Sequence, residues 1–118
     1  MSAITRHQSD ARLSRAVTHN GIVYLAGLTA DDVAAPIKGQ TEQILKKIDE
    51  LLALAGTDKS RLLSTMIYIT DMRLKAKMDE AWLAWVDPHN KPARACVETR
   101  LGGPDILVEI MVVAAQPQ

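Results

Sequence analysis

The stretch PARACVETRLGGPDILVEIMVVAA, from Pro92 to Ala115, contains two strand-like segments joined by a turn-forming loop. The first segment alternates in a period of two, as does a strand whose faces meet different surroundings. On one of its faces lie Arg94, Cys96, Glu98 and Arg100. The second segment is apolar on both parities, with Glu109 as its only charge. A strand that is apolar on both sides predicts burial on both sides, by helices and by a partner subunit.

The preceding sequence supplies the other elements of an α+β domain. The pair Asn20-Gly21 predicts a hairpin between SRAVTHN and IVYLAG, and apolar stripes at helical spacing predict two helices. The helices are expected over Thr41–Ala55 and Leu74–Val86, with a strand LLSTMIYIT between them. The predicted order is β-β-α-β-α-β-β, in two layers with both helices on one face of a mixed sheet. Residues 1–118 form one domain, and residues 1–12 are expected to be flexible.

The composition narrows the class of protein. Fourteen basic and fourteen acidic residues cancel, and only two Trp and two Tyr are available for base stacking. Nucleic-acid binding therefore has little support. A single Cys allows no internal disulfide, and no apolar run is long enough to span a bilayer. These features indicate a soluble, cytoplasmic protein without a membrane partner.

Glu109 is the most unusual residue of the last strand, because an unpaired carboxylate in an apolar strand is costly. If residues 93–100 and 106–114 pair antiparallel about Gly102-Gly103, Arg94 lies near Glu109 across the ladder. Spacing alone favours a buried structural ion pair. The alternative is a guanidinium that binds an anion beside a carboxylate that handles water.

Other kinds of site find little support. Cys96 shares the face of Arg94, which could lower its pKa, but no Cys/His constellation is visible and a small buried side chain is the favoured interpretation. HExxH, CxxC, GxGxxG and GxxxxGK[ST] are all missing, so neither a metal nor a cofactor is expected. Trp82 and Trp85 are interpreted as contacts between helix and sheet.

Several segments carry a family resemblance. The Pro92–Ala115 stretch resembles the C-terminal signature of the RidA family, also called the YjgF family. AVTHNGIVYLAG is similar to the first hairpin of that family, and LLALAGTDKSRLLSTMIYITDM to its passage from helix to strand. The resemblance implies a fold similar to bacterial chorismate mutase and a homotrimer with clefts between subunits.

The resemblance also implies an activity and a site. Archetypal members are cofactor-free deaminases of reactive 2-imino acids and enamines. The family arginine that binds the substrate carboxylate matches Arg94, and the glutamate that positions water matches Glu109. Gly27 matches the glycine of the cleft wall, and Cys96 matches a cysteine that lines the cleft.

Two departures indicate a divergent subgroup. Ser14 stands where the archetype has the tyrosine of a Gly-Pro-Tyr element, and Ala26-Gly27-Leu28 replaces its Ser-Gly-Gln. Ser14 and Leu28 are then expected to line the substrate site in place of those polar groups. Two functions stay open: an imine or enamine deaminase, and a trimer that binds small carboxylates without turnover.

Overall fold

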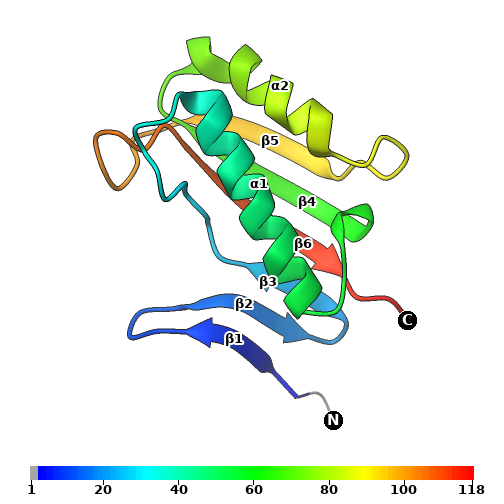
Figure 1. Ribbon diagram of the computed structural model, residues 1–118. Coiled ribbons are helices and arrows are strands. Elements are labelled where there is room, and N and C mark those ends of the chain that lie inside the picture. Colours follow the sequence, from blue (N-terminus) through cyan, green and yellow to red (C-terminus); the bar gives the residue numbers. More distant parts are fainter. Residues whose placement is uncertain (1–2) are drawn as a thin grey trace.

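The computed structural model describes residues 3–118 and shows two helices packed on one face of a six-stranded mixed sheet. The strand order across the sheet is β1-β2-β3-β6-β4-β5, and both helices lie on the same side (Figure 1). This confirms the predicted α+β class. The strands are β1 (Thr5–Ser9), β2 (Ser14–His19), β3 (Ile22–Leu25), β4 (Leu62–Ile69), β5 (Ala93–Glu98) and β6 (Val108–Ala115). The helices are α1 (Ile37–Leu54) and α2 (Lys75–Trp85), with short 3-10 turns at Lys59–Arg61 and Met72–Leu74.

The predicted hairpin is formed by β2 and β3. Asn20 and Gly21 both have positive φ angles, 52° and 77°, which suit a two-residue turn between twisted antiparallel strands. The ladder begins directly beside the turn, where His19 pairs with Ile22.

The start of the chain differs from the expectation. Thr5–Ser9 pairs antiparallel with β2 as an edge strand, so this part of residues 1–12 is ordered by main-chain hydrogen bonds and the sheet has six strands instead of five. Its side chains are polar and almost all exposed, so no apolar alternation marks it in the sequence. Met1 and Ser2 lie outside the described residues.

Helix α1 begins four residues earlier than the predicted Thr41, at Ile37. Pro36 and Gly39 suggested a loop, but proline is well tolerated where a helix begins because its missing N–H would have no helical partner. Helix α2 matches its predicted bounds within one residue. Within residues 3–118, neither helix has the length and apolar character needed to cross a bilayer.

Strand β6 lies in the middle of the sheet, antiparallel to β3 on one side and to β4 on the other. Strand β4 also pairs with β5, in parallel, and α2 connects these two strands. The connection from β5 to β6 therefore passes the end of β4. The buried Gln40 of α1 holds it there, because its amide donates to the Asp105 carbonyl and accepts from the Leu107 N–H, both at 3.0 Å.

The two faces of the sheet differ in their cover. Side chains on one face pack with α1 and α2 into a single apolar core. The other face, which we call the open face, is mostly apolar, includes Glu109, and is uncovered in one chain. It is formed by Val17, Tyr24, Met66, Tyr68, Ala95, Val97, Met111 and Val113, which share ladder positions across five strands. Tyr24 remains 48% exposed and Met111 39% exposed there in one chain.

Candidate functional site

Arg94 and Glu109 do not pair across a hairpin, so the predicted register is wrong. Strand β4 lies between β5 and β6 and uses both of its edges, one for each. Arg94 is level with Thr65 of β4, whereas Glu109 is level with Tyr68. The two residues are three positions apart along the strands and two strands apart across the sheet, which corresponds to roughly 14 Å.

The two side chains also lie on opposite faces. Arg94 shares its ladder position with Thr65 and Val112, which are buried beneath the helices. Glu109 shares its position with Tyr68 on the open face. Paired residues in a sheet project to the same side, so the Arg94 and Glu109 side chains of one chain point away from each other. A single chain does not contain the predicted pair.

Arg94 instead contacts helix α2. Its Nη1 donates to Oδ1 of Asp79 at 2.5 Å, and its guanidinium carbon lies 5.5 Å from the centre of the Trp82 ring. Trp82 is buried in the core, so the guanidinium rests on a fixed aromatic surface. The Arg94 side chain is 23% exposed. Within residues 3–118, Nη1 is the only nitrogen of this guanidinium that donates a hydrogen bond, which leaves Nε and Nη2 for a ligand.

Asp79 is a site residue that the sequence analysis missed. Its second oxygen, Oδ2, accepts from Nζ of Lys75 at 3.0 Å, one helical turn away. Burial raises the pKa of Asp79, but the hydrogen bonds from Arg94 and Lys75 outweigh that effect and hold it below the usual range. The Lys-to-Asp spacing of four residues was visible in the sequence. The contact with Arg94 depends on how α2 packs on β5.

Glu109 lies against Gly27 on the other face. A Cβ added to residue 27 would come 3.1 Å from Cδ of Glu109 and would collide with Oε2. The glycine therefore leaves the space that the carboxylate occupies. Within the described chain, Glu109 accepts no hydrogen bond and forms no ion pair. Tyr68, its ladder neighbour, is a second residue that sequence reasoning did not single out.

Cys96 lies two residues after Arg94 on the helix-covered side and packs against the apolar core. Burial raises the pKa of its thiol, and the positive charges of Arg94 and Lys75 offset only part of that effect. Arg94 does lower this pKa, as expected, but burial raises it by more. A protonated, partly buried thiol is consistent with a packing role.

Ser14 and Leu28 lie apart from Arg94. The Ser14 hydroxyl is 2.7 Å from the hydroxyl of Ser9 in the β1–β2 ladder. This ladder lies at the opposite edge of the sheet from β5. Leu28 is 6% exposed, and its main chain bridges to Ile110. Its side chain packs in the core, and its role in lining a substrate site stays a prediction. Gly27, its neighbour, faces the opposite way and is exposed.

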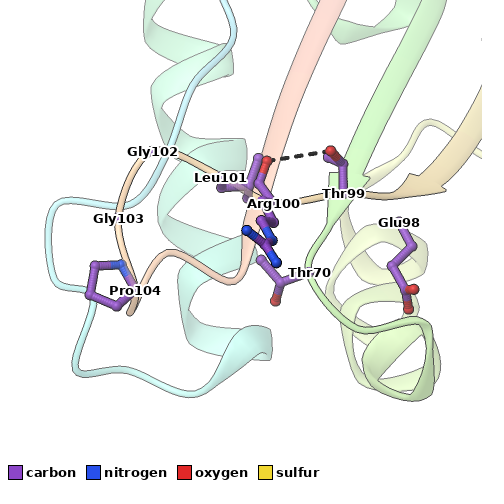
Figure 2. A pocket seen from close by; sticks show the side chains of 8 residues that line it. All are labelled: Thr70, Glu98, Thr99, Arg100, Leu101, Gly102, Gly103 and Pro104. Carbon is purple, nitrogen blue, oxygen red and sulfur yellow. Dashed lines mark hydrogen bonds between the residues drawn. The ribbon is translucent and has the colours of Figure 1, made fainter.

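A depression of about 680 Å³ lies at the opposite end of β5 from Arg94 and contains none of the predicted site residues. In Figure 2 the guanidinium of Arg100 extends toward Thr70, while the Glu98 carboxylate turns away from it. Glu98 is engaged elsewhere, because it accepts from the N–H of Met72 at 2.8 Å. A smaller depression of about 370 Å³ is lined by Arg94, Met66 and Met111 among others.

Comparison with known proteins places these features in a family. The family model described as endoribonuclease L-PSP matches residues 3–116. A RutC family protein of Haemophilus ducreyi is 42% identical over 112 residues, which cover 95% of this chain and 96% of that protein.

Solved structures agree. A YjgF family protein from Neisseria meningitidis superimposes with a TM-score of 0.96 at 38% identity, covering 98% of this chain and 97% of that one. YyfA from Yersinia pestis, described as a protein of unknown function of the conserved Rid family, gives 0.87 at 30% identity, covering 96% and 99%.

Proposed function

The chain belongs to the endoribonuclease L-PSP family, which includes the YjgF, RutC and Rid proteins, and on that premise we propose that it is a 2-iminoacid or enamine deaminase. The observation that carries the proposal is the state of Arg94. Its guanidinium is held in place by Asp79 and Trp82, with Nε and Nη2 still available within the described chain. A fixed, partly desolvated guanidinium edge is suited to a small carboxylate.

Arg94 would orient the substrate through that carboxylate. Two parallel N–H···O bonds fix both the position and the plane of a 2-imino acid, so its C=N carbon is presented in one direction. Water then adds to this carbon to form a carbinolamine, which loses ammonia and leaves a 2-oxo acid. Neither step changes the oxidation state of the substrate.

Glu109 would orient the attacking water and accept its proton, then return the proton to the departing nitrogen. A carboxylate placed for this work typically accelerates a reaction by roughly 10²- to 10⁴-fold. The space beside Gly27 and the absence of a partner for Glu109 within residues 3–118 support this role.

The site would be completed by a second copy of the chain. Arg94 lies on β5, which forms one edge of the sheet, while Glu109 lies on the open face. A neighbouring copy that covers the open face would bury its apolar residues. It would also bring the β5 edge of one subunit's sheet to the open face of another subunit. We propose a homotrimer in which each cleft takes Arg94 from one subunit and Glu109 from another.

A direct assay tests the activity. An amino-acid oxidase generates 2-imino acids in solution, and semicarbazide traps those that persist. We expect the purified protein to suppress trapping, and Arg94→Ala to reduce the effect by roughly 10²- to 10³-fold through loss of the charge-assisted bonds. Arg73→Ala is a matched control, because Arg73 is an exposed arginine paired with Asp71. An unchanged trapping rate with several amino acids would overturn the deaminase proposal.

A second candidate is a trimer that binds small carboxylates without turnover. The observation in its favour is that Ser14, in the place of the archetypal tyrosine, bonds to Ser9. Carboxylate binding by calorimetry, without acceleration of imine loss, would favour this candidate.

The nucleolytic activity named in the family description receives no support from charge. Acidic and basic residues balance at fourteen each, so the chain carries no net attraction for phosphates.

A further inference from the structure

Three charged side chains form a cluster where α2 packs on β5: Lys75, Asp79 and Arg94. Asp79 bridges the two cations, with Nζ of Lys75 at 3.0 Å from one oxygen and Nη1 of Arg94 at 2.5 Å from the other. The Asp79 and Arg94 side chains are 21% and 23% exposed. The cluster is therefore partly desolvated, where charges act on one another more strongly than in open water.

Asp79 restricts how Arg94 can meet a ligand. A guanidinium offers a carboxylate either the edge formed by its two Nη atoms or the edge formed by Nε and Nη2. Nη1 of Arg94 already donates to Asp79, and the guanidinium lies over the Trp82 ring. Only the Nε–Nη2 edge is then free for a bidentate contact.

Asp79 also sets the charge of the cluster. Lys75 and Arg94 together carry two positive charges, and ionised Asp79 reduces the sum to one. Its pKa lies below the ordinary 3.8, so it is ionised at neutral pH. The other acidic residue on this part of α2, Glu80, pairs with Lys77 and Lys38 and leaves the balance of the cluster unchanged.

We propose that Asp79 makes the Arg94 site selective for monocarboxylates over dicarboxylates, an inference that rests on the proposed binding of substrate by Arg94. One net positive charge and one free guanidinium edge match a single carboxylate. A second carboxylate on the ligand would meet the negative charge of Asp79 without an unneutralised cation to receive it.

Calorimetry with two 2-oxo acids of equal chain length tests this selectivity without requiring turnover. The probes are 2-oxopentanoate, with one carboxylate, and 2-oxoglutarate, with two. We expect the wild-type protein to bind 2-oxopentanoate more tightly. Asp79→Asn keeps an acceptor for Nη1 and removes the charge, so it should shift the ratio of affinities toward 2-oxoglutarate by roughly tenfold.

Two further variants separate charge from structure. Lys75→Gln combined with Asp79→Asn returns the cluster to one net charge and should restore the wild-type ratio. Glu80→Gln removes a charge from the neighbouring position of α2 and should leave the ratio unchanged. Thermal melts of each variant establish that it is folded.

The outcomes distinguish the selectivity from the proposed function. Equal binding of both probes by the wild type, or a ratio unaltered in Asp79→Asn, overturns the selectivity and leaves the Arg94 site standing. Selective binding without imine hydrolysis supports the selectivity and overturns only the deaminase activity. Failure to bind either probe overturns the Arg94 site and the selectivity together.

Discussion

Arg94 and Glu109 lie on opposite faces of one sheet, on strands that are separated by β4. The interpretation that spacing alone favoured, a buried structural ion pair within one chain, is therefore wrong. If the two residues act on one substrate, they must come from different copies of the chain. The arrangement thus ties the proposed chemistry to assembly, and each can be tested through the other.

Mixing two inactive variants tests whether the cleft is shared. Arg94→Ala and Glu109→Gln should each lose most activity alone. When they are unfolded together and refolded as mixed trimers, about a quarter of the clefts should contain both native residues, since each cleft draws on two chains. Imine trapping measures the recovered activity. A site contained within one chain would recover none.

Gly27→Ala should separate activity from stability. The added methyl group collides with the end of the Glu109 side chain, which is flexible and can move away. We therefore expect a loss of stability below about 1 kcal/mol, together with a clear loss of activity because the carboxylate is displaced. Denaturant melts and imine trapping measure the two effects. Gly102→Ala, where an added Cβ has no neighbour within 4 Å, is the control.

Met111→Glu should prevent assembly. Met111 lies in the middle of the open face and is 39% exposed in one chain, so a partner subunit would bury the introduced carboxylate among apolar side chains. Light scattering coupled to size exclusion should show a trimer for the wild type and a monomer for the variant. Leu83→Glu, on the exposed side of α2 at 70% exposure, should keep the wild-type mass. A Met111→Glu trimer would contradict the proposed interface.

The stability contribution of Asp79 should depend on pH in a defined direction. Burial raises the pKa of Asp79, but Arg94 and Lys75 lower it by a larger amount. The pKa in the folded protein therefore lies below the ordinary 3.8. The contribution is therefore complete above about pH 5 and is lost as the pH falls through 3.8 and below. In thermal melts across this range, the wild type should have a higher melting temperature than Asp79→Asn near neutral pH. The difference between the two melting temperatures should shrink as the pH falls. A gap that widens in acid would contradict this assignment.

Much of the architecture could be predicted from local patterns. Asn20-Gly21 defined the β2–β3 hairpin because its turn geometry depends on the two residues themselves. The apolar stripes predicted both helices, and the two-sided apolar character of the last strand indicated a covered sheet. The polar edge strand β1 was not predicted, since it is held by main-chain pairing and its side chains show no apolar alternation.

The candidate site was predicted in its members more than in its arrangement. Alternation correctly placed Arg94 and Cys96 on one face of β5. Glu109 was singled out as the only charge in an apolar strand, and the resemblance added Gly27. Register could not be predicted, because consecutive strands joined by a loop usually pair, whereas here β4 lies between them. Asp79 was missed for a related reason: its partner is fifteen residues away on another element.

The sequence by itself determined both helices, the strands other than β1, and the family, and it supplied the residues that we propose bind and hydrolyse a small carboxylate substrate. These properties follow from local conformational preference and side-chain chemistry. Only the tertiary structure decided that Arg94 meets Asp79 on one face while Glu109 meets Gly27 on the other. Strand order depends on which pairing buries the most apolar surface over the whole chain, and no local segment contains that information.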